Sequence, residues 1–199
     1  MKKTFEITIP TDWSEISIKK FMRYNNAVNE LEDQHQIIVK TISTLCDIDE
    51  SVVEVMKLSD LQKIQGSLQK LIGKPINKEI INKIDIEGTM YGFHPKIDEI
   101  TMGEFVDIET FAKDNDMAKL MSVFYRPITK TQGNRYDIEP YDIDMHGKNA
   151  DKFENLSINI GNAVAVFFWN LGSEQLHNFH QSSEKEANHQ HHQVMDGLV

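Results

Sequence analysis

The sequence predicts an α+β fold that is predominantly helical and carries a small antiparallel β-sheet. Through most of the chain, apolar residues recur every three or four positions, which is the spacing of one face of an α-helix. Two runs rich in β-branched and aromatic residues flank Glu87-Gly88-Thr89 and predict a β-hairpin over about residues 81–94. The alternating run FEITI predicts an N-terminal strand, Phe5–Ile9. Because an isolated hairpin is only marginally stable in water, we expect it to pair with this strand or to pack on helices.

Residues 14–73 predict a cluster of three or four helices joined by short turns. The first two helices are indicated by apolar faces that contain Tyr24 and Ile42, and Asp49 is placed to cap a short third helix. The sequence SDLQ, residues 59–62, has the capping-box pattern and predicts the start of the fourth helix. The apolar positions of this helix are Leu61, Ile64, Leu68 and Leu71.

The second half of the chain predicts further helices over residues 101–126. The sequence TMGE, residues 101–104, is another capping-box pattern, and helical spacing resumes near residue 117. Pro127 is expected to end the helix, because proline has no N–H and disfavours helical geometry in the residue before it. Residues 128–150 are mostly polar and are predicted to form a long connection.

A last helix is predicted over residues 157–175, with Ser157 placed to cap it. Its wide apolar stripe predicts a central place in the core. The stripe consists of Ile160, Ala163, Val164, Phe167, Phe168 and Leu171. Residues 176–199 are polar and His-rich, which predicts a disordered tail. We therefore predict a single α+β domain over residues 1–175, followed by this tail.

The charge of the chain excludes several classes of partner. Its 199 residues include 31 acidic and 21 basic side chains, which gives a formal net charge of −10. Binding to nucleic acid or to anionic lipid needs a basic surface, so we expect neither nucleic acid nor a membrane as a partner. The longest apolar run, residues 163–169, is too short to cross a bilayer, and the single Cys46 cannot form an internal disulfide. These observations predict a cytoplasmic protein.

No motif in the sequence predicts catalysis, and we expect no catalytic residue, no metal site and no cofactor. A glycine-rich phosphate loop, a nucleophile elbow and an HExxH motif are all absent. The acidic run at residues 136–146 lacks the glycine turn and terminal glutamate of a calcium loop, so we interpret it as solvated. The tail histidines are also interpreted as solvated, because no carboxylate or thiol ligand is fixed beside them. These histidines are His177, His180, His189, His191 and His192.

Phe124, Tyr125 and Arg126 are the candidate partner-binding residues. Aromatic residues and arginine are enriched at the energetic centres of protein interfaces, so these side chains predict an exposed anchor for a partner. The alternative hypothesis is that Arg126 lies at the C-terminal end of a helix, where a cation complements the helix dipole, and pairs with an acid such as Glu139.

Five segments of the chain carry a family resemblance. In order they are IPTDWSEISIKKF, YGFHPKIDEITMGEFVDIETF, KLMSVFYRPIT, YDIEPYD and AVAVFFWNL. Together they resemble a group of small proteins encoded in the structural gene clusters of tailed bacteriophages. The resemblance extends over roughly Ile9 to Leu171, and its best-matching parts are Ile100–Phe111 and Leu120–Ile128. It implies a role in virion morphogenesis and transfers no catalytic residue.

Within that group, the chain most resembles tail assembly chaperones, which are soluble, acidic, helical proteins that shield hydrophobic tail proteins before assembly. This resemblance implies a non-enzymatic assembly factor in the host cytoplasm, with an exposed apolar groove or stripe and a hydrophobic or helical partner. The alternative is a minor structural component of the virion, in the baseplate, hub or neck, which predicts symmetric homo-oligomers with large buried interfaces. An enzyme, the third hypothesis, requires a deep polar pocket with perturbed titrating groups.

Overall fold

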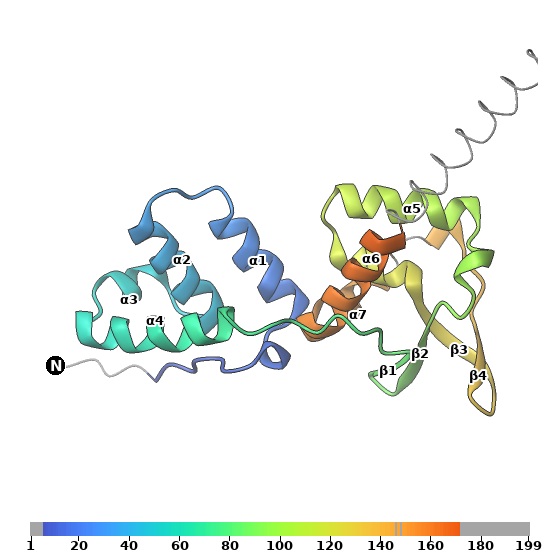
Figure 1. Cartoon of the computed structure of the whole chain (residues 1–199), viewed down its shortest axis with the longest axis horizontal. Coiled ribbons are helices and arrows are strands. Elements are labelled where there is room, and N and C mark those ends of the chain that lie inside the picture. The colour runs from blue at the N-terminus through green and yellow to red at the C-terminus, as the bar shows by residue number, and fades with distance from the viewer. Residues whose placement is uncertain (1–5, 146, 148, 172–199) are drawn as a thin grey trace, which may run out of the picture. The chain divides into compact units, whose positions relative to one another are not determined.

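The computed structural model describes residues 6–145, 147 and 149–171 (Figure 1). The chain divides into two compact units, residues 1–164 and 165–199. The first unit has an α+β fold, as the sequence predicts, with helices and a four-stranded antiparallel sheet. In the second unit, residues 165–171 are helical, and the tail predicted at 176–199 lies outside the described residues.

The N-terminal part of the first unit contains the predicted helical cluster (Figure 1). Its elements are η1 (Trp13–Glu15), α1 (Ile18–Val28), α2 (Gln34–Cys46), α3 (Glu50–Glu54) and α4 (Leu58–Ile72). The Ser17 hydroxyl and the carboxylates of Asp33 and Asp49 accept hydrogen bonds from backbone N–H groups in the first turns of α1, α2 and α3. The capping box predicted at residues 59–62 is wrong, because α4 already begins at Leu58.

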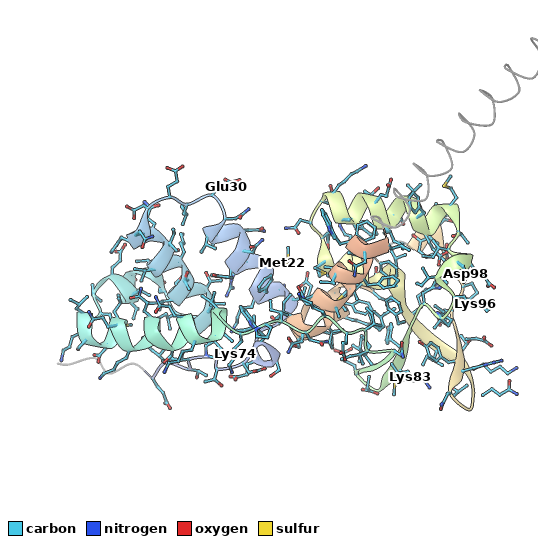
Figure 2. The ribbon with its side chains drawn as sticks, viewed as in Figure 1. Met22, Glu30, Lys74, Lys83, Lys96 and Asp98 are labelled. Carbon is cyan, nitrogen blue, oxygen red and sulfur yellow. The ribbon has the colours of Figure 1, made fainter. Side chains whose placement is uncertain are left out.

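The apolar faces of these helices meet around α2. Ile42 and Leu45 of α2 and Leu68 of α4 are each 1% exposed. Trp13 is also buried, and its indole Nε1 donates a hydrogen bond to the carbonyl oxygen of Lys74 at 3.0 Å (Figure 2 labels Lys74). This bond ties the segment before α1 to the residues that follow α4. Burial of each leucine or isoleucine stabilises the fold by roughly 1.5–3 kcal/mol.

The sheet has the strand order β1-β2-β3-β4, and all neighbours are antiparallel. Its strands are β1 (Lys83–Ile86), β2 (Thr89–Phe93), β3 (Tyr125–Gln132) and β4 (Arg135–Ile138). The predicted hairpin is confirmed as β1 and β2. Glu87 and Gly88 join them with φ values of 54° and 80°, and two positive values in succession are typical of a type I′ turn.

The prediction of which segments form the strands beside the hairpin is wrong. Residues 6–9, from the proposed N-terminal strand, are in no strand. The hairpin instead pairs with β3, which occupies sequence that we predicted as the end of a helix and the start of a polar connection. The remainder of that connection contains β4. The helix before β3, α6 (Met117–Phe124), ends two residues before Arg126, because Tyr125 already has an extended backbone.

Pro127 explains this difference between expectation and structure. A proline holds the preceding residue in extended geometry, which suits Arg126 to a strand as well as it ends a helix. Pro127 lies opposite Tyr91 in the sheet, and its carbonyl oxygen accepts a hydrogen bond from the N–H of Glu139 at 2.9 Å. Gly133, with a φ of 60°, then allows β3 to turn into β4.

Further helical elements complete the first unit (Figure 1). They are η2 (Ile97–Glu99), α5 (Met102–Lys113), α6, η3 (Ile143–Met145), α7 (Ala150–Glu154) and a helix that begins at residue 158. Among them, α6 packs with β3 and with the helices α5 and α7. The capping box predicted for α5 is confirmed, with reciprocal hydrogen bonds between Thr101 and Glu104. Ser157 caps the helix at residue 158, as predicted, by accepting from the N–H of Asn159 at 3.2 Å.

Candidate functional site

Phe124 and Tyr125 belong to the aromatic core beside the sheet. Each is 1% exposed. The ring of Phe124 stacks on that of Phe93 with centroids 5.4 Å apart, and the Tyr125 ring meets Phe93 edge-on at 5.3 Å. The Tyr125 hydroxyl donates to the carbonyl oxygen of Ile81 at 2.7 Å. The prediction that these side chains form an exposed anchor is therefore wrong, because the end of α6 and the start of β3 both direct them into the core.

Arg126, the third predicted anchor residue, is 9% exposed and pairs with Glu104 rather than with Glu139. Its Nη2 lies 2.7 Å from Oε1 of Glu104, and the guanidinium carbon lies 5.7 Å from the centre of the Tyr141 ring. Burial alone raises the pKa of Glu104. Hydrogen bonds from His94 and Thr101, together with the charge of Arg126, outweigh this effect and bring its pKa to about 2.

The buried ion pair between Glu104 and Arg126 connects the first turn of α5 to β3, and its chemistry favours a structural role. A carboxylate with so low a pKa is a weak base and a poor candidate for proton transfer near neutral pH. The only cysteine is equally unreactive, because burial raises the pKa of Cys46 to about 11 and keeps its thiol neutral.

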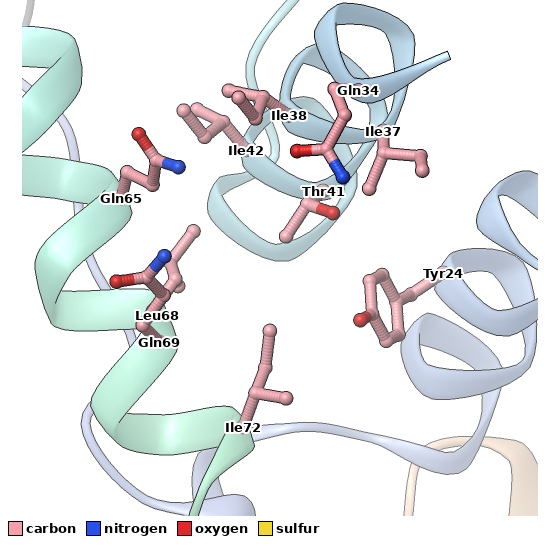
Figure 3. Close-up of a pocket in the computed structure, with 10 residues that line it drawn as sticks. All are labelled: Tyr24, Gln34, Ile37, Ile38, Thr41, Ile42, Gln65, Leu68, Gln69 and Ile72. Carbon is pink, nitrogen blue, oxygen red and sulfur yellow. The ribbon is translucent and has the colours of Figure 1, made fainter. Parts of the chain in front are cut away.

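An apolar groove lies in the helical cluster (Figure 3), and it is the candidate functional site. Its volume is about 200 Å³. One wall comes from α1, the floor from α2 and the other wall from α4. The lining residues are Tyr24, Gln34, Ile37, Ile38, Thr41, Ile42, Gln65, Leu68, Gln69 and Ile72. We call this site the helical-cluster groove.

The groove exists because α1 and α4 both pack against α2 and do not pack closely against each other. Ile42 and Leu68 close its base, since each is 1% exposed. Ile37 and Ile38 are partly exposed above them, and Ile72 is 42% exposed. The side chains thus leave an accessible apolar surface that the helical cluster itself does not cover.

The polar groups of the groove are neutral. Gln34, Gln65 and Gln69 contribute amides, which both donate and accept hydrogen bonds. Burial raises the pKa of Tyr24, while its interaction with Thr41 opposes this shift, and the phenol stays protonated near neutral pH. At about 200 Å³ the groove is smaller than the roughly 300–1,000 Å³ typical of small-molecule sites. It therefore suits a few side chains of a protein partner better than a whole metabolite.

A second hollow on the same cluster is polar, and most of its charged side chains form ion pairs within the chain. It is lined in part by Arg23, Lys40, Asp47 and Glu50. Nη2 of Arg23 lies 2.7 Å from Oδ1 of Asp47, and Nζ of Lys40 lies 2.6 Å from Oε1 of Glu50. Because these charges neutralise one another, the hollow is a weaker candidate for binding than the helical-cluster groove.

Within the described part of the chain, no group of three or more His, Cys, Asp or Glu side chains is arranged to hold a metal ion. The five tail histidines considered above lie outside that part. The described helices also include none that is long and apolar enough to cross a membrane.

Sequence patterns identified several groove residues but predicted them as core. Ile42 and Leu68 fall on the expected apolar faces. The sign of a groove is the additional apolar residue beside each face, namely Ile37 in α2 and Ile72 in α4. These two positions widen the apolar stripe beyond the width that one packed neighbour covers.

Comparisons of the chain with protein-family models, with curated proteins and with solved structures find no match.

Proposed function

We propose that this chain is a non-enzymatic assembly factor of a tailed bacteriophage, a tail assembly chaperone that holds an apolar segment of a tail protein in the helical-cluster groove. The resemblance of its sequence segments to phage morphogenesis proteins supports the phage context. The groove supports the binding role, and it is the observation that carries the proposal. The protein acts in the host cytoplasm during assembly.

The chemistry of the groove favours a helical segment as its occupant. An amphipathic helix presents apolar side chains at intervals of three or four residues, and such helices bind in apolar grooves between other helices. Ile37, Ile38 and Ile72 offer apolar contact, while the glutamine amides of α4 bind polar groups at the edge of the occupant. The absence of charge in the lining matches an apolar occupant, because an unpaired charge buried on binding weakens association.

The groove is tested by a charged substitution at its edge. Ile72→Glu places a carboxylate where a partner would bury it, yet Ile72 is 42% exposed, so the unbound fold tolerates the change. Leu58→Glu is the matched control, because Leu58 lies in the same helix, is 69% exposed and does not line the groove. Each variant is co-expressed with the individual tail proteins of the phage that encodes the chain.

We expect the unmodified chain and Leu58→Glu to keep one tail protein soluble and to co-purify with it. Ile72→Glu should weaken the complex by about tenfold or more, because burying an unpaired charge or polar group costs roughly 1–3 kcal/mol or more. If Ile72→Glu co-purifies with the same tail protein as well as Leu58→Glu does, the groove is not the binding site.

The chaperone proposal and the alternative, a minor structural component of the virion, predict different locations for the protein once assembly is complete. Mass spectrometry of purified mature virions and of the infected-cell lysate separates them. A chaperone is abundant in the lysate and absent from the virion. A fixed copy number per virion instead identifies a building block of the baseplate, hub or neck and overturns the chaperone proposal.

A further inference from the structure

One end of the helical-cluster groove carries a concentrated negative charge. The connection between α1 and α2 contains Glu30, Glu32 and Asp33, and all three are exposed (Figure 2 labels Glu30). Asp33 immediately precedes Gln34, which lines the groove. We call these three residues the acidic loop.

The charge of the acidic loop is not neutralised within the described part of the chain. No lysine or arginine described there forms an ion pair with any of its three carboxylates, and the last turn of α1 contains no basic residue. The Asp33 carboxylate accepts a hydrogen bond from the N–H of Gln36 at 2.8 Å, which holds it at the start of α2.

Other acids of the helical cluster behave differently. Asp47 pairs with Lys20 and Arg23, and Glu50 pairs with Lys40. Local basic residues therefore neutralise Asp47 and Glu50 of the polar hollow, while the acids beside the groove keep their charge. This contrast leaves a negative field at one end of an apolar, uncharged groove.

We infer that the occupant of the groove is an amphipathic helix with lysine or arginine residues grouped at one end, and that this end lies against the acidic loop. The inference rests on the proposed function of the groove. Complementary charge at the rim of an interface fixes orientation and accelerates association, while the apolar contacts hold the complex together. The acidic loop would thus set the direction in which the tail-protein helix enters the groove.

Three synthetic peptides test this inference. All carry the same apolar stripe at helical spacing, and they differ only in the last turn, which holds three lysines, three glutamines or three glutamates. Their binding to the full chain is measured by fluorescence anisotropy at about 0.1 M and about 1 M salt, where the Debye length falls from about 10 Å to about 3 Å.

We expect the lysine peptide to bind about tenfold more tightly than the glutamine peptide at the lower salt concentration, since each exposed ion pair contributes a factor of roughly 1.4 to 5. The glutamate peptide should bind most weakly, and high salt should remove most of the difference. The variant Glu30→Gln/Glu32→Gln/Asp33→Asn should bind the lysine and glutamine peptides equally. Asparagine at position 33 preserves the helix cap.

A charge-matched control separates a local effect from the net charge of −10. Glu54→Gln/Glu87→Gln/Glu109→Gln removes the same number of negative charges from exposed positions outside the acidic loop. This variant should retain the preference for the lysine peptide. Equal loss of the preference in both triple variants would overturn the inference.

The results also distinguish failure of this inference from failure of the proposed function. Equal affinity of the unmodified chain for all three peptides would overturn the role of the acidic loop while leaving the groove as a binding site. If no peptide binds but a tail protein binds in a manner sensitive to Ile72→Glu, a helical occupant is wrong and the groove stands. If neither the peptides nor any tail protein binds, the proposed function itself fails.

Discussion

Replacing Arg126 is expected to lower the free energy of unfolding of the first unit far more than replacing any exposed charged residue does. The Arg126→Met substitution keeps much of the side-chain volume but leaves the Glu104 carboxylate, 3% exposed, without its cationic partner. Breaking a buried ion pair from one side costs roughly 3–5 kcal/mol.

The assay is urea unfolding followed by circular dichroism, with Glu154→Gln as the control. Glu154 pairs with Lys19 at 2.6 Å, but the two side chains are 39% and 67% exposed, so breaking this pair should cost at most about 1 kcal/mol. We expect Arg126→Met to lower the free energy of unfolding by about 3 kcal/mol or more relative to this control. A loss below about 1 kcal/mol would refute the structural role of the Arg126–Glu104 pair.

The same pair predicts how stability depends on pH. The folded-state pKa of Glu104 is depressed, so its contribution is complete above about pH 4.5 and is lost as the pH falls toward about 2. Glu104→Gln should therefore flatten the acid side of the stability profile between these values. A variant profile that is parallel to that of the unmodified chain would show that Glu104 is not the group responsible.

Other substitutions test the packing of the first unit. Gly92→Ala should destabilise the sheet by about 1–3 kcal/mol in thermal unfolding, because the new Cβ would lie 2.3 Å from the Tyr136 ring; a neutral effect would contradict this close approach. Phe153→Ala should cost about 3–5 kcal/mol in urea unfolding, since Phe153 is fully buried, and a loss below about 1 kcal/mol would place it outside the core. Cys46 should react with a thiol reagent only on unfolding, and rapid reaction of the native chain would contradict its burial.

Local patterns were sufficient for much of the fold. The apolar spacing around Ile42 and Leu68 predicted the helical cluster, and the turn at Glu87 and Gly88 predicted the first hairpin. The capping box that begins at Thr101 located the start of α5. In each case the residues that determine the element are neighbours in the sequence, so the pattern contains the information needed.

The failures involve residues whose structure depends on distant parts of the chain. Pro127 is compatible with both a helix end and a strand, and only its pairing with Tyr91 selects the strand. Arg126 has several acids within reach along the sequence, yet its partner, Glu104, lies in another element. The groove was missed because periodicity places Ile42 and Leu68 on apolar faces without showing whether another helix covers the apolar residues beside them, Ile37 and Ile72.

The most direct test of the groove is a methyl NMR titration of the full chain, labelled at the isoleucine δ1 methyl groups, with the tail protein that it keeps soluble. Ile37, Ile38 and Ile72 line the groove, while Ile143 is 56% exposed elsewhere in the first unit and serves as the internal control. We predict that the three groove methyl signals shift or broaden on binding and that the Ile143 signal does not. Perturbation of Ile143 with unchanged groove signals would contradict the proposed site.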